Sequence, residues 1–258
     1  MFRRIKDNLL AHGGVRPFCK SPNKRKVAVV LSGCGVFDGS EIHEASATAV
    51  HLCRKNLQPI FYSPNIGQTD VVNHSTGEKI DQPRNVFTES ARIARGDLKQ
   101  LSELTVCDAD AIIFPGGFGV AKNLSNYATA SVSCALNIDV CRVIQDFHAQ
   151  RKPMGFMCIS SILAARMIPN VVITLGARGT EPGQSPEDWP HSDALDAAVQ
   201  MGASIELQGV HGISIDVENM VVSTPAFMYR GDFYQVFTGI GRLVDQMECL
   251  LRMGENNS

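Results

Sequence analysis

Residues 153–167 read PMGFMCISSILAARM, and this stretch decides the fold. The first five residues are apolar apart from a proline and a glycine, which predicts a short buried strand ending at Cys158. Helix-forming residues follow with no spacer and predict a helix over 159–167. A strand that runs straight into a helix is the building unit of an α/β protein. The residue at such a junction lies on a tight turn at the carboxyl end of the strand.

The segments on either side of this unit repeat the alternation. Apolar runs that end at glycine or proline, KVAVVL at 26–31 and ADAIIF at 109–114, predict strands buried on both faces of a parallel sheet. Further strands are predicted at 58–62, 171–175, 204–207, 213–217 and 220–224, and helices at 41–55, 89–95, 132–150, 192–201 and 230–252. Hairpin turns are expected at 73–77 and around Glu218-Asn219. In the first helix, Ser40 is the expected cap, and the expected buried face holds Ile42, Ala45, Ala49 and Leu52.

This alternation predicts an α/β fold: a three-layer, mostly parallel open sheet with helices on both faces. In such sheets the functional site lies at the carboxyl ends of the strands. The chain has 258 residues, 44% of them hydrophobic and 19% charged, which suits one large domain with a substantial core. We expect this domain to span 26–258.

Charge and cysteine content exclude several classes of function. The formal net charge is −2, which gives no electrostatic reason to bind nucleic acid, and no apolar run is long enough to cross a membrane. The eight cysteines are scattered without a C-x-x-C pair, which favours reduced thiols over a zinc site. His43-Glu44 lacks the second histidine of H-E-x-x-H, and Asp38 stands where G-x-G-x-x-G needs glycine. We therefore expect no metal and no other cofactor.

The N-terminal segment 1–25 differs from the rest of the chain. It has seven basic residues against one acid, Asp7, and Phe2, Ile5, Leu9 and Leu10 would form an apolar stripe on a helix. This composition is typical of a mitochondrial transit peptide. The alternative is a disordered basic tail on a cytoplasmic protein. The first interpretation predicts location in the mitochondrial matrix.

Cys158 is the first candidate for chemistry. The strand-to-helix turn has the geometry of a nucleophile elbow, with sulfur in place of a serine oxygen. The N-terminus of the following helix is expected to lower the pKa of the thiol and so raise the thiolate fraction. The alternative is a buried structural cysteine, because reduced proteins contain many of these.

Two glycines follow the 109–114 strand and supply candidate backbone donors. The N–H groups of Gly116 and Gly117, together with that of Ile159, could form an oxyanion hole over the sulfur. A simple tight turn is the alternative. Lys122 and Asn123 come directly afterwards and could contact a substrate or be solvated.

Glu41 and Glu44 are the candidate acids. They lie three residues apart in the first turn of the predicted 41–55 helix and therefore share a face. A carboxyl beside a thiolate could act as a general acid or base. The alternative is the ordinary preference for acidic residues at a helix N-terminus. Asn73 and His74, in the predicted hairpin turn, are further candidates for the pocket. His74 and His191 lie in loops after strands and could orient a site, and the alternative is that they are solvated.

Six motifs together resemble one known family. They are LSGCGVFDGSEIHEA (31–45), DVVNHSTGE (70–78), PRNVFTESARIARG (83–96), PGGFGVAKNLSNYA (115–128), GFMCISS (155–161) and TPAFM (224–228). They are similar to the PfpI-like superfamily of class I glutamine amidotransferase-like domains, and within it to the ElbB-like glyoxalases and the mitochondrial ES-one proteins. The resemblance runs from Lys26 to the C-terminal helix.

The resemblance implies a flavodoxin-like sandwich with Cys158 on its elbow, Glu44 as the acid beside it, and a homodimer. It implies a cofactor-independent glyoxalase that converts small 2-oxoaldehydes such as glyoxal and methylglyoxal to 2-hydroxy acids. No histidine stands where amidotransferases of this class place their activating one, and His191 is the nearest in chain order. The alternatives are a redox-sensing or regulatory protein with little catalysis, and a deglycase or amidase-type hydrolase.

Overall fold

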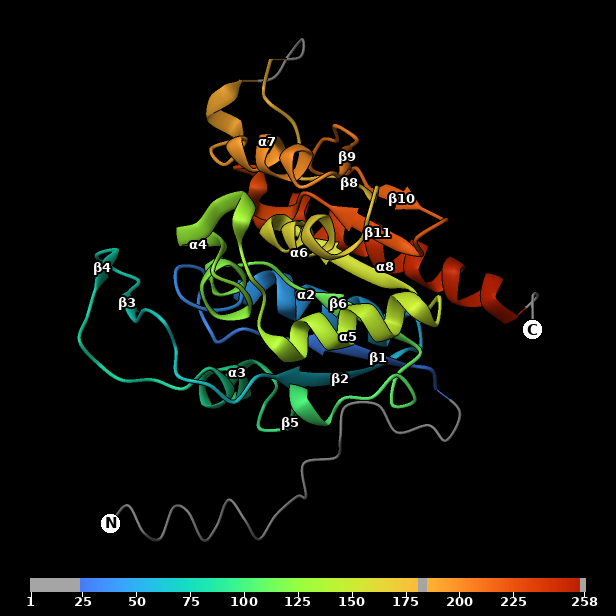
Figure 1. The fold of residues 1–258 in the computed structure, drawn as a ribbon, viewed down its shortest axis with the longest axis horizontal. Coiled ribbons are helices and arrows are strands. Elements are labelled where there is room, and N and C mark those ends of the chain that lie inside the picture. The colour runs from blue at the N-terminus through green and yellow to red at the C-terminus, as the bar shows by residue number, and fades with distance from the viewer. Residues whose placement is uncertain (1–23, 181–184, 256–258) are drawn as a thin grey trace, which may run out of the picture.

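The central element of the fold is a seven-stranded sheet with the order β10-β11-β7-β6-β1-β2-β5 (Figure 1). The computed structural model describes residues 24–180 and 185–255. Neighbouring strands are parallel except for the β10–β11 pair. The strands of the sheet are β1 (Lys26–Val30), β2 (Gln58–Ser63), β5 (Leu98–Gln100), β6 (Ala111–Phe114), β7 (Met154–Met157), β10 (Ser214–Asp216) and β11 (Val221–Thr224). Two small sheets pair β3 (Val72–Asn73) with β4 (Glu78–Lys79), and β8 (Val172–Ile173) with β9 (Ser204–Ile205).

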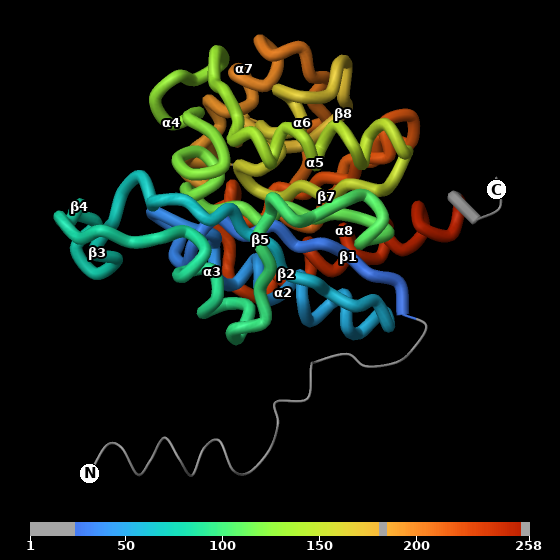
Figure 2. The backbone as a smooth tube through the Cα atoms, turned by 60° about the horizontal axis from the view of Figure 1, so that its bottom comes forward, coloured from blue at the N-terminus to red at the C-terminus, as the bar shows by residue number. Residues whose placement is uncertain are grey.

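Helices cover both faces of the sheet, so the fold has three layers. Figure 2 places α5 and α6 on one side of the strands and α2 and α8 on the other. The α-helices are α2 (Ile42–Arg54), α3 (Val86–Ile93), α4 (Tyr127–Ala130), α5 (Ile138–Ala149), α6 (Ser161–Met167), α7 (Asp193–Gln200) and α8 (Phe233–Glu255). Shorter turns are η1 (Leu101–Glu103), η2 (Val120–Leu124), η3 (Ser131–Ser133), η4 (Cys158–Ser160), η5 (Pro186–Asp188) and η6 (Ala226–Met228). None of the described helices is both long and apolar enough to span a bilayer.

The predicted mostly parallel α/β sandwich is confirmed, and its core explains why the strand sequences are so apolar. Every residue of β6, β7 and β11 is buried, as is β1 after its first residue. Helices close over both faces of these strands, which leaves no polar face for alternating residues. The largest buried side chains include Phe114 and Phe156, whose rings stack 5.2 Å apart across β6 and β7.

The strand order also fixes where the site must lie. β1 is followed by α2 and β2 toward one edge of the sheet, whereas β6 lies on the other side of β1. The chain thus leaves β1 and β6 in opposite directions, and the carboxyl ends of two such strands are where open α/β sheets place their functional site. The segments after β1, β6 and β7 converge there.

The predicted buried face of the first helix was right for Ala45 and Leu52 and wrong for Ile42. Ile42 is 42% exposed, whereas Glu44, Thr48 and His51 are buried beside Ala45 and Leu52. The cap was also misassigned. The Glu41 side chain accepts the hydrogen bond from the N–H of Glu44, while the hydroxyl of Ser40 accepts from the N–H of Ser32 instead. Apolar periodicity failed because polar side chains on this helix find partners inside the protein.

Two further elements differ from the prediction, and one agrees. The predicted strand at 171–175 shrinks to β8, which lies outside the main sheet, because side chains of Asp216 and Ser223 accept the N–H groups of Val172 and Thr174. The predicted helix at 132–150 begins only at Ile138, behind the side-chain cap of Asn137. The hairpin turn at 73–77 is confirmed between β3 and β4, which protrude from the body of the protein (Figure 1).

Almost all of the predicted transit segment 1–25 lies outside the described residues.

Candidate functional site

Cys158 occupies a strained elbow between β7 and α6. Its φ is +54°, a left-handed conformation that side chains other than glycine seldom adopt, and the preceding Met157 is extended with φ −138°. Ser160 stabilises the turn: its hydroxyl accepts the N–H of Met157 at 2.9 Å and lies 2.6 Å from the carbonyl oxygen of Phe114. The elbow therefore holds the sulfur at the carboxyl end of β7.

Glu44, in the first turn of α2, meets this sulfur from another element of the fold. Its side chain is fully buried, and it hydrogen-bonds the thiol of Cys158. One carboxylate oxygen accepts the N–H of Gly116 at 2.7 Å, and the other accepts the N–H of Phe227 at 3.2 Å. Three chain segments that are far apart in sequence thus fix this carboxyl against Cys158.

Two backbone N–H groups face the sulfur as well. The N–H groups of Ile159 and Gly117 donate to Cys158. They come from the start of η4 and from the turn after β6, where Gly117 has φ +98°. Donors fixed in this way can also stabilise negative charge on an oxygen that develops beside the sulfur.

Burial dominates the electrostatics of the pair. It raises the pKa of Glu44 to about 8, with a further rise from the charge of Glu41, and the Phe227 and Gly116 donors oppose this shift. Burial also raises the pKa of the Cys158 thiol well above its ordinary value, and the nearby Glu44 adds to the rise. The expected lowering of the thiol pKa was therefore wrong, because desolvation of the sulfur outweighs the N–H donors.

We expect the reactivity of Cys158 to rise with pH through about 8. Below this pH both groups of the pair hold their protons, and above it Glu44 is ionised and can take the thiol proton. Alkylation of Cys158 by iodoacetamide, followed by mass spectrometry of its peptide, measures the profile. A rate that is flat between pH 6 and 10, or that falls through pH 8, would contradict the assignment.

Gly116 is required at its position because the site leaves no room for a side chain. A Cβ there would lie 2.5 Å from the Cβ of Cys158 and 2.7 Å from the nearer Glu44 oxygen. We expect Gly116→Ala to separate the pair, lowering alkylation of Cys158 at pH 9 by about a hundredfold and the free energy of unfolding by about 1–3 kcal/mol. The control is Gly67→Ala, where an added Cβ meets nothing within 4 Å. Equal losses in both variants would contradict the steric argument.

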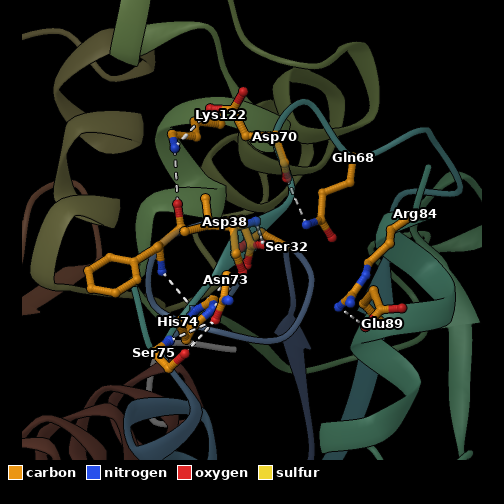
Figure 3. Close-up of polar contacts among 12 residues, drawn as sticks. Ser32, Asp38, Gln68, Asp70, Asn73, His74, Ser75, Arg84, Glu89 and Lys122 are labelled. Carbon is orange, nitrogen blue, oxygen red and sulfur yellow. Dashed lines mark hydrogen bonds and ion pairs between the residues drawn. The ribbon is translucent and has the colours of Figure 1, made fainter. Parts of the chain in front are cut away.

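Four predicted pocket residues have partners elsewhere, and Figure 3 shows three of them, Asn73, His74 and Lys122. Lys122 pairs with Asp70 at 3.0 Å and donates to the carbonyl of Phe37. Asn123 is buried, and its amide donates to the carbonyls of Ser32 and Asp38 at 2.9 Å. The ring of His74 accepts the N–H of Phe37, and Asn73 closes its own hairpin turn by accepting from Ser75. Lys122, Asn123 and His74 thereby anchor the loop that leads into Glu41 and Glu44, whereas the Asn73 side chain bonds only within its own turn.

Sequence reasoning missed Phe227 as a donor to Glu44. This residue lies in η6, 183 positions after Glu44. Its neighbour Ala226 has φ +46°, a second strained position beside the site. The only signal was the TPAFM motif at 224–228, which contains no titratable side chain. His191 lies against Phe118, with the ring centroids 5.6 Å apart. In the part of the chain that the structure describes, none of the six histidines hydrogen-bonds Cys158.

Related sequences match most of the chain. The mitochondrial ES1 protein homolog of Rattus norvegicus is 43% identical over 225 residues, which cover 87% of this chain and 83% of the relative. The Homo sapiens protein called glutamine amidotransferase-like class 1 domain-containing protein 3, mitochondrial, is 43% identical over 220 residues, covering 85% and 81%. No family model matches. The relatives are named as mitochondrial, so the expected mitochondrial location is confirmed.

Solved structures give the same fold. The isoprenoid biosynthesis protein with an amidotransferase-like domain from Ehrlichia chaffeensis is 30% identical, with a TM-score of 0.78 over 88% of this chain and 99% of that one. A ThiJ/PfpI domain protein from Brachyspira murdochii has a TM-score of 0.53 at 12% identity, covering 88% and 99%, which shows the shared fold alone.

Proposed function

The chain belongs to the mitochondrial ES1 family of glutamine amidotransferase-like class 1 proteins, and from this premise we propose that it is a cofactor-independent glyoxalase with Cys158 as its nucleophile. The proposed substrates are small 2-oxoaldehydes such as glyoxal and methylglyoxal. The products are the corresponding 2-hydroxy acids.

The first step forms a carbon–sulfur bond. Glu44, once ionised, takes the proton of the Cys158 thiol, and the sulfur adds to the aldehyde carbon of the substrate. The aldehyde oxygen becomes an alkoxide, for which the N–H groups of Gly117 and Ile159 are the available donors. Glu44 now holds a proton beside the new hemithioacetal.

The remaining steps isomerise and release the product. Glu44 first gives its proton to the alkoxide, which completes the neutral hemithioacetal and leaves the carboxylate free to act as a base. It then removes the proton from the former aldehyde carbon and delivers it to the neighbouring carbon through an enediol, while the hydroxyl proton of the former aldehyde passes to the oxygen of that neighbouring carbon, so the hemithioacetal becomes a thioester. Water then cleaves the thioester, giving the 2-hydroxy acid and the free thiol. The sum is addition of one water to the oxoaldehyde, with no external oxidant or reductant.

The observation that supports this proposal best is the contact between a fully buried acid and the sulfur. A carboxyl whose pKa is raised to about 8 can both accept and donate a proton near neutral pH, as transfer between two carbons requires. The burial of the pair also limits access of bulk water to the enediol.

The two alternatives receive less support from the same geometry. A sensor of oxidation needs an exposed thiolate, whereas Cys158 is 8% exposed and burial raises its pKa. An amidase of this class needs an activating histidine, and the described histidines do not bond the sulfur. The homodimer stays a prediction, which analytical ultracentrifugation tests.

Lactate formation from methylglyoxal by the full chain, without added thiol, metal or nucleotide, tests the proposal. We expect steady turnover that is unaffected by a metal chelator. Absence of lactate from a folded protein that still alkylates at Cys158 would sink the glyoxalase assignment. Sulfinic acid forming at Cys158 under mild peroxide, with methylglyoxal untouched, would favour the redox alternative.

A further inference from the structure

Glu41 is a second buried carboxylate at the edge of the site, and the mechanism above does not use it. It is 7% exposed. One of its oxygens accepts the N–H of Glu44 at 2.7 Å, and the other lies 2.7 Å from Nδ1 of His43. Its own N–H donates to the carbonyl of Gly116 at 2.9 Å. Glu41 is thereby joined both to the backbone of the acid and to the turn that carries the donors.

His43 connects this carboxylate with solvent. Its side chain is 56% exposed, and its ring packs against Phe233 at 4.5 Å and edge-on to Phe227 at 6.3 Å. Phe227 is the residue whose N–H donates to Glu44. The Glu41–His43 pair therefore forms one side of the enclosure around Glu44.

Few charged or titratable groups face Glu44. Its own helix contributes Glu41, and η4 contributes Cys158, while the turn after β6 and η6 contribute only the N–H groups of Gly116 and Phe227. The donors favour an ionised Glu44, and a second carboxylate on the same helical turn disfavours it. Among the described residues, Glu41 is thus the charge that acts against ionisation of Glu44, whereas the hydrogen bond from Cys158, like the backbone donors, favours it.

We propose that Glu41 is a positioning residue whose negative charge keeps Glu44 protonated and so sets the pH at which Cys158 becomes nucleophilic. The charge acts through Glu44 and need not touch the substrate. An effect of Glu41 on turnover rests on the proposed function, but its effect on the ionisation of Glu44 and the reactivity of Cys158 does not. Unfavourable placement of like charges is a common way to hold a carboxyl in its acid form.

The pH dependence of Cys158 alkylation by iodoacetamide tests this role in the full chain. Glu41→Gln keeps an oxygen that can cap the helix and removes the charge. We expect the midpoint of the alkylation profile to fall by about one pH unit. His43→Lys leaves Glu41 in place but adds a cation beside it at a half-exposed position, and we expect a shift in the same direction. A purely structural role for Glu41 would change the rate without moving the midpoint.

Two matched controls show whether the shift of the midpoint is specific to the charge of Glu41. One tests the loss of a different buried charge, and the other tests the loss of the His43 imidazole. Glu89→Gln removes another buried carboxylate, on the first turn of α3, and His43→Gln removes the ring without adding charge. We expect both to keep the wild-type midpoint. An unchanged midpoint in Glu41→Gln and His43→Lys, or an equal fall in Glu89→Gln, would overturn the proposal. If Glu41→Gln does not fold, the midpoint measured for His43→Lys tests the proposal by itself. Iodoacetamide is not an oxoaldehyde, so the result stands even if no lactate forms from methylglyoxal.

Discussion

Cys158→Ser will lose methylglyoxal turnover by about a thousandfold or more, while its thermal unfolding midpoint stays within about 3 °C of the wild type. The loss follows because serine at this elbow has no activating histidine among the described residues, and its hydroxyl is far less acidic than a thiol. The fold survives because oxygen replaces sulfur with no other change of shape. Lactate assays and calorimetry on the same preparations measure both quantities.

The matched control for this substitution is Cys249→Ser. Cys249 is an exposed free thiol on α8 and touches none of the residues around Cys158. We expect this variant to keep wild-type turnover. Substantial activity in Cys158→Ser, or an equal loss in Cys249→Ser, would remove Cys158 from the role of nucleophile.

Glu44→Gln will lose turnover on a similar scale, since glutamine can neither accept the thiol proton nor move a proton between carbons. A reduction by about a thousandfold is expected. The conservative variant Glu44→Asp keeps the acid but withdraws it from the sulfur, so it should retain a small fraction of the activity. Turnover in Glu44→Gln close to that of the wild type would contradict the proton-shuttle role.

Glu44→Gln will become more stable relative to the wild type as the pH rises. The pKa of Glu44 is about 8 in the folded protein against an ordinary value of 4.5, so its contribution to stability is fully present below 4.5 and is lost as the pH rises through 8. Each pH unit in this window costs the wild type about 1.4 kcal/mol. Glutamine does not titrate, so the difference in free energy of unfolding should move by several kcal/mol in favour of the variant between pH 5 and 9. Urea titrations at both pH values measure it, and a difference that is constant with pH would contradict the buried acid.

The sequence was sufficient for the architecture because each strand and its turn are local signals. The apolar run into Cys158, the helix formers after it and the two glycines after β6 specify the elbow and its neighbouring turn without reference to the rest of the chain. The hairpin at 73–77 was predicted for the same reason. Right-handed crossovers between these units limit the strand orders that are possible, but local signals do not choose among them.

The errors arose where buried polar groups are satisfied by distant partners. The predicted face of the first helix did not include His51, which is buried because its Nε2 lies 2.9 Å from the carbonyl oxygen of Phe237, 186 residues away. Gly241 leaves the space for this ring. The burial of Glu44 likewise depends on Phe227, and no local sequence pattern predicts either contact. Polar residues that the fold buries as if they were apolar are the exceptions to the helical periodicity, and Glu44 among them marks the site.

The last donor to Glu44 has a consequence for how the protein is made. Phe227 follows β11, and β11 pairs with β7, so the acid gains its second N–H only after both strands and most of the chain are in place. Contacts of such long sequence separation form late in folding. A chain that ends before residue 227 lacks this donor and cannot form the enclosed acid. The protein therefore acquires its reactivity only when synthesis is nearly complete.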